Sequence, residues 1–149
     1  MKMVDVGQKI ISKREAVVEG RVCLKPSIIL AIKNKRIPKG DVLEAAKLAG
    51  ILAAKKTPFL IPLCHPIPTE YVNIEFSLGR EEIKIKTTVR ARAKTGVEME
   101  AFTATAISAL TIYDMCKALD REITISGIRL LKKTGGKGGK YMSNLEVKG

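Results

Sequence analysis

Asp114 and Lys117 have the residue types and the spacing of an acid–base pair. They lie near the end of residues 96–120, which have a helical pattern, and side chains three residues apart lie side by side on a helix. At 100° per residue, the apolar stripe of Ile107 and Leu110 runs on to both charged residues, so we expect the pair to face the interior. Burying a carboxylate and an amine in a core costs free energy unless the two groups form an ion pair or have a function. The spacing alone therefore fits a buried structural ion pair as well as a catalytic pair.

Glu100 places another carboxylate near the beginning of the same predicted helix. It precedes Asp114 by two heptads, so the two carboxylates lie within about 40° of one face and about 21 Å apart along the axis. The spacing excludes direct contact between them, and a solvated helix start would explain Glu100 without any function.

The only histidine lies in a proline-rich loop. Residues 57–68 contain four prolines and include Leu63, Cys64 and His65, and we expect no regular structure there. A single histidine excludes a multi-histidine metal site within one chain. Cys64 has no neighbouring cysteine, so we interpret it as a packing or substrate contact rather than a nucleophile. A lone histidine is more often structural, but a rigid loop fixes its side chain at low entropic cost, which favours a functional role.

Two lysines lie in segments typical of anion binding. Lys137 lies among the glycines of residues 133–139, where backbone N–H groups can surround phosphate oxygens. The segment lacks the spacing of a P-loop, and a flexible tail would have the same composition. Lys39 precedes Asp41, a predicted N-cap, and the start of a helix favours anions.

The composition is that of one compact domain, residues 1–149. A chain of this length with 46% hydrophobic residues can bury a core, which must be mainly aliphatic because 4% of the residues are aromatic and tryptophan is absent. No stretch approaches the roughly 18 apolar residues of a membrane span, and the first ten residues lack the pattern of a secretion signal. Three distant cysteines without a CxxC pair fit a reducing cytoplasm rather than a disulfide framework or a zinc site.

The net charge of +12 at pH 7 favours an anionic partner. A nucleic acid, a phosphorylated small molecule and a lysine-rich solvated surface would all fit this charge. The basic residues are scattered along the chain, which favours local basic pockets over a polybasic tail.

The hydrophobic pattern predicts strand, helix, helix, hairpin, helix and strand. This order fits an α+β fold in which helices cover a mainly antiparallel sheet, in a ferredoxin-like arrangement. A sheet with one uncovered face can require a partner chain, so we expect an oligomer. The expected elements are an extended lead-in at 1–12, a strand at 14–24, helices at 26–36 and from Asp41 to about Lys56, strands near 70–78 and 82–92, the helix at 96–120, and a strand at about 123–132 before a glycine-rich tail.

Taken together, these segments resemble the cyclic pyranopterin monophosphate synthase family, also called the molybdenum cofactor biosynthesis protein C family. The resemblance covers nearly the whole chain in order. Residues 67–76 and Phe102 depart from the family's common forms, at positions where we expect packing roles. The segments that carry the resemblance are MVDV (3–6), KREA (13–16), KGDV (39–42), LCHP (63–66), GVEMEAFTATAISALTIYDMCKALD (96–120) and IRLLKKTGGKGG (128–139).

The resemblance implies a lyase of molybdenum cofactor (molybdopterin) biosynthesis. Such an enzyme converts (8S)-3′,8-cyclo-7,8-dihydroguanosine 5′-triphosphate, made upstream by a radical iron–sulfur enzyme, into cyclic pyranopterin monophosphate and pyrophosphate. The rearrangement needs proton transfers and phosphate binding but no redox change. The resemblance therefore implies no cofactor and no metal site, and leaves open whether Mg²⁺ accompanies the triphosphate.

The resemblance also assigns site residues by position. Asp114 and Lys117 match the family's catalytic aspartate and lysine; we expect Asp114 to shuttle protons and Lys117 to act as an acid or to keep Asp114 ionised, with the pair titrating as a unit. Lys39, Lys137 and Arg14 would bind phosphates, and His65 and Glu100 would recognise the purine-derived ring. The substrate contacts implied in all are Leu63, Cys64, His65, Glu98, Met99, Glu100, Lys39, Lys137 and Arg14.

The 21 Å separation along one helix predicts a site shared between chains. Glu100 and Asp114 of a single chain cannot both reach the reacting centre of one small substrate. We therefore expect the site to lie across a subunit interface, and the resemblance implies a hexamer built as a trimer of dimers.

Two other function classes make different predictions. A basic RNA-binding module needs aromatic side chains on one sheet face, whereas Tyr71 and Phe76 are five residues apart and lie on opposite faces of their strand. A non-catalytic nucleotide-binding homologue would keep the basic loops but lose nothing on Asp114→Asn. We expect neither a nucleic acid nor a membrane as a partner.

Overall fold

The computed structural model describes residues 1–144 and contains all seven elements that the sequence predicts, with one further short strand at the end. The elements are β1 (Ser12–Cys23), α1 (Pro26–Lys33), α2 (Val42–Leu60), β2 (Tyr71–Leu78), β3 (Glu82–Ala93), α3 (Glu98–Cys116), β4 (Thr124–Thr134) and β5 (Tyr141–Met142).

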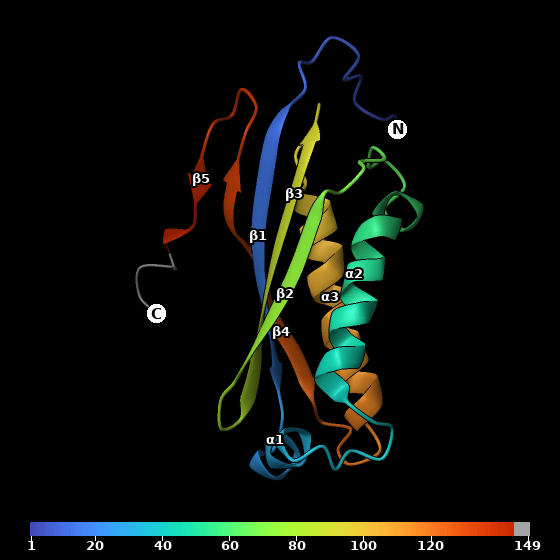
Figure 1. Ribbon diagram of the computed structural model, residues 1–149, viewed down its shortest axis with the longest axis vertical. Helices are drawn as coiled ribbons and strands as arrows, with labels where there is room; N and C mark the ends of the chain where they lie inside the picture. Colours follow the sequence, from blue (N-terminus) through green and yellow to red (C-terminus); the bar gives the residue numbers. More distant parts are fainter. Residues whose placement is uncertain (145–149) are drawn as a thin grey trace.

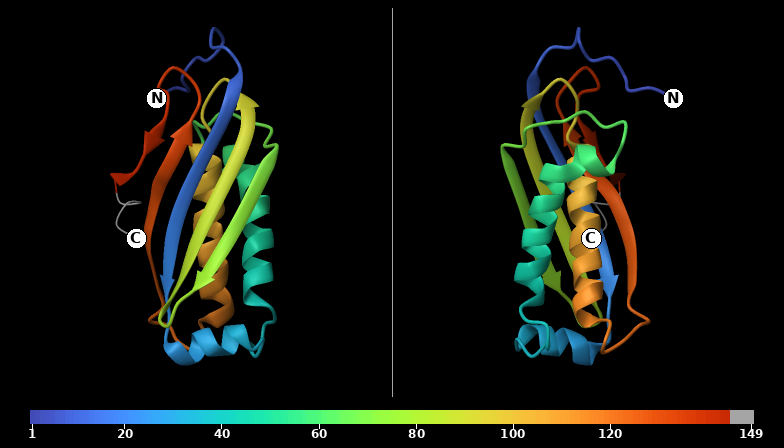
Figure 2. Two further views of the ribbon diagram at one scale, coloured as in Figure 1. Left: turned by 60° about the vertical axis from the view of Figure 1, so that its left-hand side comes forward. Right: turned by 90° about the vertical axis from the view of Figure 1, so that its right-hand side faces the viewer.

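The strands form one antiparallel sheet in the order β2-β3-β1-β4-β5. Its first four strands have the ferredoxin-like β-α-β-β-α-β connection, and β5 extends one edge. Helices α2 and α3 pack side by side on one face of the sheet (Figures 1 and 2). The predicted α+β, ferredoxin-like fold is therefore confirmed.

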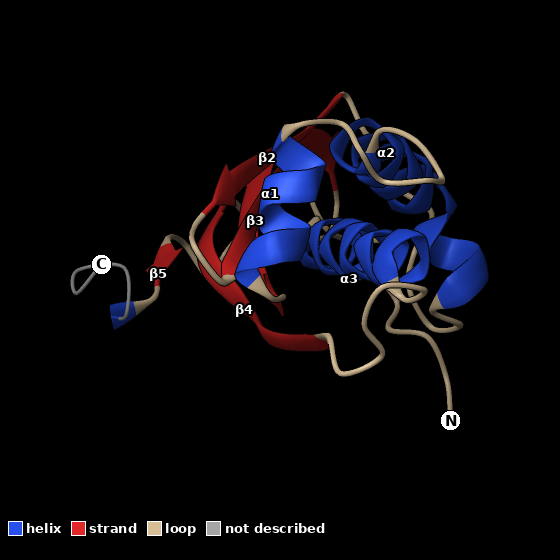
Figure 3. Cartoon of the chain, turned by 90° about the horizontal axis from the view of Figure 1, so that it is seen from below, coloured by secondary structure: helices blue, strands red, loops and turns tan. Residues whose placement is uncertain are grey.

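The core lies between the sheet and these two helices. Alternate residues of β3, including Ile83, Ile85 and Val89, are fully buried, as the period-2 pattern predicts. Helix α1 closes one end of the core with Ile28, Ile29 and Ile32 (Figure 3). No helix within residues 1–144 is long and apolar enough to cross a membrane.

The buried face of α3 differs from the predicted one. Small residues such as Ala101, Ala104 and Ser108 face the core, whereas Leu110 is 53% exposed. The Ser108 hydroxyl donates a hydrogen bond to the Ala46 carbonyl of α2 at 2.9 Å. The prediction that Ile107 and Leu110 mark the buried face was wrong, because small side chains allow α2 and α3 to approach closely.

Helix α2 also extends beyond its predicted end and into the proline-rich segment. Asp41 caps its start by accepting a hydrogen bond from the Glu44 N–H, as predicted. The helix runs through Pro58 to Leu60, although we expected it to end near Lys56. Pro58 has no N–H to donate within the helix. In the same turn the Thr57 hydroxyl donates a hydrogen bond to the Ala53 carbonyl, which supports the helix there.

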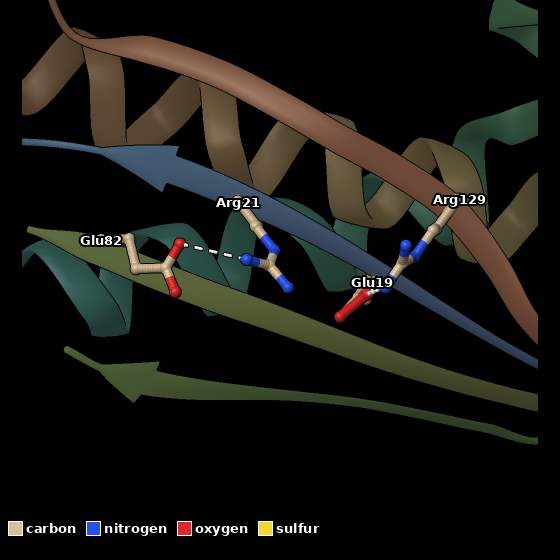
Figure 4. A network of polar contacts seen from close by, with 4 residues as sticks. All are labelled: Glu19, Arg21, Glu82 and Arg129. Carbon is tan, nitrogen blue, oxygen red and sulfur yellow. Dashed lines mark hydrogen bonds and ion pairs between the residues drawn. The ribbon is translucent and has the colours of Figure 1, made fainter. Parts of the chain in front are cut away.

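The uncovered face of the sheet carries paired charges. Glu19 of β1 accepts hydrogen bonds from Arg129 of β4, and Arg21 pairs with Glu82 of β3 at 3.4 Å (Figure 4). On the same face Glu15 contacts both Arg90 and Lys132. These ion pairs make the second face of the sheet a polar surface, and its coverage by a partner chain stays a prediction.

Candidate functional site

The predicted site residues form two groups at opposite ends of α3. The helix runs the length of the molecule, from the end where the N-terminal segment and the loop after α2 lie to the end near α1 (Figure 1). Asp114 and Lys117 lie at the α1 end, and Glu98, Met99 and Glu100 lie at the other.

At the α1 end, Asp114 is held between two lysines. Lys117 Nζ lies 2.7 Å from one carboxylate oxygen of Asp114, and Lys39 Nζ lies 3.0 Å from the other. All three side chains are about half exposed, so the expectation that Asp114 and Lys117 face the interior was wrong. The structure thus contains an accessible acid–base cluster, which we call the lysine–aspartate cluster (Lys39, Asp114, Lys117).

The elements around this cluster explain its geometry. Asp114 lies in the last turn of α3, and Lys117 is the C-cap residue of this helix. Lys39 reaches it from the loop between α1 and α2, and its ammonium group also donates to the Asp114 carbonyl at 2.9 Å. Carbonyls of a final helical turn lack intrahelical partners, so one lysine satisfies both the helix end and the carboxylate.

The two ammonium groups also set the ionisation of the cluster. Hydrogen bonds from Lys117 and then from Lys39 hold the pKa of Asp114 below its ordinary value. The Asp114 carboxylate in turn raises the pKa of Lys117. At neutral pH the cluster therefore contains an ionised carboxylate between two ammonium groups, and a substrate group that displaced one lysine would strengthen Asp114 as a base.

At the other end of α3, positive side chains line a cavity of about 650 Å³. We call it the cationic cavity. The start of β1, the turn before α3, the β4–β5 loop and the N-terminal segment contribute to its wall. The residues that line it are Gln8, Lys9, Ile10, Ser12, Arg14, Thr95, Gly96, Lys133, Gly135, Gly136, Lys137 and Gly138.

Arg14 connects the β4–β5 loop to the turn before α3. Its guanidinium group donates to the carbonyls of Ala93 and Lys94 at 3.2 and 3.0 Å. Gly135 and Gly136 lie against it with φ of 102° and 72°, and a Cβ at Gly136 would lie 2.0 Å from an Arg14 nitrogen. The glycines thus allow a close approach that other residues would prevent. Arg14 and Lys137, both predicted phosphate contacts, lie around one cavity.

Lys133 lies among the predicted site residues, although its place in the sequence did not single it out. It lines the cationic cavity and forms an ion pair with Glu98 at the start of α3. This contact connects β4 to the helix that carries the predicted substrate contacts. Its position at the beginning of the glycine-rich segment, four residues before Lys137, was the feature of the sequence that could have indicated it.

Glu100 is buried and lacks a polar partner. Its side chain is 1% exposed, and neither carboxylate oxygen accepts a hydrogen bond within the part of the chain that the structure describes. Burial, with a smaller contribution from the negative charge of Glu98, raises the pKa of Glu100 to about 7. Glu100 is therefore available at neutral pH both as a hydrogen-bond donor and as an acceptor. The alternative of a solvated helix start is excluded.

The loop after α2 lies near these carboxylates. Burial and then the charges of Glu100 and Glu98 raise the pKa of the Cys64 thiol, which agrees with its interpretation as a contact rather than a nucleophile. His65 Nε2 lies 2.7 Å from the Val4 carbonyl oxygen. A carbonyl only accepts hydrogen bonds, so Nε2 carries a proton, and in the neutral ring Nδ1 is left as an acceptor.

The structure thus separates residues that the sequence analysis grouped. Lys39, predicted to bind phosphate with Lys137 and Arg14, lies at the other end of α3 and contacts Asp114. Leu63 and Met99 are 44% and 37% exposed and so are available for contact. Within residues 1–144, no group of three or more histidine, cysteine, aspartate or glutamate side chains is arranged to hold a metal ion.

Comparison with known proteins identifies the family. The model of the MoaC family matches residues 3–136. A cyclic pyranopterin monophosphate synthase of Roseiflexus sp. (strain RS-1) is 49% identical over 145 residues, 96% of this chain and 92% of the relative. The synthase of Heliobacterium modesticaldum is 50% identical over 95% of this chain and 90% of the relative. A molybdenum cofactor biosynthesis bifunctional protein of Chlorobaculum tepidum is 51% identical over 92% of this chain and 44% of the relative. The chain therefore belongs to the MoaC family.

Proposed function

We propose that this protein is a lyase that converts (8S)-3′,8-cyclo-7,8-dihydroguanosine 5′-triphosphate into cyclic pyranopterin monophosphate and pyrophosphate. The names of its relatives support this reaction. The observation that carries the proposal is the chemistry at the two ends of α3. One end has an acid–base cluster, and the other has a cationic cavity beside a buried carboxylic acid. The reaction needs both proton transfer and triphosphate binding.

The lysine–aspartate cluster would carry the proton transfers. Asp114 would shuttle protons, and Lys117 would act as an acid or keep Asp114 ionised. Lys39 already contacts Asp114, so its ammonium group could exchange this carboxylate for a substrate phosphate during the reaction. General acid–base catalysis of this kind contributes about 10²- to 10⁴-fold to a rate.

The opposite end would bind and orient the substrate. Arg14, Lys133 and Lys137 would neutralise the triphosphate in the cationic cavity. Glu100 and the Nδ1 atom of His65 would form hydrogen bonds to the purine-derived ring. Contacts to the rest of the substrate would come from Leu63, Cys64, Glu98 and Met99.

A complete site would require two chains. Glu100 and Asp114 are about 21 Å apart along α3, yet an exposed stripe connects their regions: Met99 and Leu110 are 37% and 53% exposed and lie within about 20° of Lys117 around the helix. A second copy that packs antiparallel along this stripe would place its Asp114 end beside the Glu100 end of the first. Such a two-fold contact creates two equivalent sites.

The neighbouring surface of α2 supports this packing. It exposes Leu48, Leu52 and Phe59 by 60%, 46% and 87%, and exposed apolar residues gathered on one side of a molecule favour an interface. We propose a hexamer that is a trimer of such dimers.

The setting proposed for this enzyme follows from its reaction. The whole chain, residues 1–149, would be one synthase domain in the cytoplasm. Its substrate would come from a radical iron–sulfur enzyme upstream, with no nucleic acid or membrane involved.

The proposed reaction is tested by incubating the purified protein with the cyclised dihydro-GTP and measuring pyrophosphate release. We expect release with the wild type and none with Lys117→Ala. Circular dichroism of the variant should match the wild type, since Lys117 is half exposed. No release from the folded wild-type protein would reject the proposed function.

A further inference from the structure

The N-terminal segment (residues 1–11) crosses the end of the molecule at which the cationic cavity lies. It precedes β1 and passes close to the loop after α2 (Figure 1). Within residues 1–144, two hydrogen bonds join it to neighbouring loops: the Val4 carbonyl accepts one from His65, and the Gly7 carbonyl accepts one from Lys94 Nζ at 3.3 Å. Both partners belong to loops at this end, so the segment lies across the site rather than away from it.

A local turn shapes this segment. The Asp5 carboxylate accepts a hydrogen bond from the Gly7 N–H at 2.8 Å, and the Lys9 N–H donates to the Val6 carbonyl at 3.0 Å. The first bond forms an Asx turn at residues 5–7, and the second closes a tight turn over residues 6–9. The turn places Gln8 and Lys9 in the wall of the cationic cavity.

The segment is attached by few contacts and buries little apolar surface. Val4 and Ile10 are 67% and 85% exposed, and both contacts that hold the segment to the loops lie at exposed positions. Segments of this kind open at a low free-energy cost. One of the two contacts also occupies His65, a residue proposed to bind the substrate.

We propose that residues 4–10 form a lid over the cationic cavity and that Lys9 is a further binding residue for the substrate's triphosphate. In the free protein the Val4–His65 and Gly7–Lys94 contacts dock the lid. A triphosphate in the cavity gives Lys9 an anionic partner and draws the lid inward. Lys94 acts as a positioning residue, since it holds the lid and does not line the cavity.

The identity of the triphosphate rests on the proposed function, whereas the anion site and its lid do not. Inorganic tripolyphosphate therefore serves as a probe that requires no catalysis. Its affinity for the full-length wild type, Lys9→Ala, Lys94→Met and Lys2→Ala is measured by isothermal titration calorimetry. Lys2→Ala removes the same charge from the same segment, but Lys2 does not line the cavity. It thus controls for long-range electrostatic attraction.

We expect Lys9→Ala to weaken tripolyphosphate binding about tenfold or more, because a hydrogen bond to a charged group is lost. Lys94→Met should weaken it several-fold, and Lys2→Ala should leave it within about twofold of the wild type because exposed charges outside the cavity are screened. A Lys9→Ala affinity equal to that of the wild type or of Lys2→Ala would overturn the proposal.

Movement of the lid is measured separately. The chain has no tryptophan and three tyrosines, so Ile10→Trp places a single tryptophan in the cavity wall, which can be excited selectively. Its emission should change as tripolyphosphate saturates the site, and an unchanged emission spectrum at saturation would contradict lid closure. If tripolyphosphate binding depends on Lys9 but the wild type releases no pyrophosphate from the cyclised dihydro-GTP, the proposed reaction fails while the lid stands.

Discussion

At the scale of single residues, Asp114 is the group on which the proposed chemistry depends most directly. It accepts hydrogen bonds from two ammonium groups, which hold its pKa low and keep it ionised at pH values where an ordinary aspartate begins to bind protons. Its partial exposure means that folding depends little on this cluster. Catalysis and stability should therefore respond differently to its replacement.

Asp114→Asn should lower kcat for pyrophosphate release by about 10²- to 10⁴-fold, because the amide cannot accept a proton. The midpoint of thermal unfolding should change little. Steady-state kinetics and a thermal melt of the same preparation test both statements. Glu122→Gln removes one negative charge from the loop that follows α3 and should retain activity. An equal loss of activity in both variants would indicate a general electrostatic effect.

Glu100 should make stability depend on pH. Its pKa is raised from 4.5 to about 7 in the folded protein, so the folded state binds a proton that the unfolded chain releases. The stability contributed by this group is complete below about pH 4.5 and is lost as the pH rises to about 7. The penalty at higher pH is on the order of 3 kcal/mol.

Glu100→Gln should therefore raise the free energy of unfolding at pH 8 by up to about 3 kcal/mol and leave it almost unchanged at pH 4.5. Urea unfolding at one fixed protein concentration measures both values. Activity should fall in the same variant, since the amide cannot exchange a proton with the substrate. A destabilised variant at pH 8 would show that the ionised carboxylate has a partner in the assembled protein.

At the scale of elements, the β4–β5 loop depends on the glycines that lie against Arg14. Gly136→Ala should weaken substrate binding, because a methyl group at φ 72° would lie 2.0 Å from the guanidinium nitrogen. We expect a rise in KM of about tenfold or more if one charged contact is lost. Gly79→Ala, in the turn between β2 and β3, is the control, since Gly79 does not line the cavity and a Cβ there meets no atom closer than 3.4 Å; similar KM values for the two variants would contradict this account of the loop.

The contact between α2 and α3 depends on Gly50. A Cβ at this position would lie 2.3 Å from both Ile74 Cδ1 and Ser108 Oγ. Gly50→Ala should therefore destabilise the protein by about 1–3 kcal/mol through overpacking, despite the higher helix propensity of alanine. Urea unfolding against Gly138→Ala tests this prediction, and an unchanged or increased stability would contradict it.

The elements were largely predictable from local pattern, whereas their contacts were not. Alternation in β3 and the Asp41 cap depend on near neighbours in sequence, and both were predicted. The buried face of α3 was missed because Leu110 is more hydrophobic than Ser108, although only the small side chain fits against α2. Hydrophobicity alone does not report how closely two helices approach.

In the candidate functional site, too, the contacts between distant segments were not predictable from the sequence. Resemblance to a family supplied the residues but not their grouping, so Lys39 was placed with phosphate-binding lysines rather than on Asp114. The Lys133–Glu98 and His65–Val4 contacts join segments that only the folded chain brings together.

At the scale of the whole molecule, the proposed site residues of one chain lie in two groups at opposite ends of α3. Met99 and Leu110 are exposed on the side of α3 that runs from one group to the other, and we propose that a second copy packs antiparallel along this side. Complementary half-sites of this kind explain why the acid–base cluster and the cationic cavity are so far apart in one chain. The central claim is therefore that each site takes Asp114 and Lys117 from one chain and the cationic cavity from another.

The most direct test mixes two inactive variants. Lys117→Ala damages one half-site and Lys133→Ala the other, and each alone should release no pyrophosphate from the cyclised dihydro-GTP. After unfolding and refolding together in equal amounts, half of the dimers contain one chain of each kind, and one of their two sites is intact; about a quarter of wild-type activity should return. One variant is labelled with ¹⁵N so that mixed dimers can be identified by mass. Activity that stays at the level of the separate variants, although mixed dimers are present, would show that each site lies within a single chain.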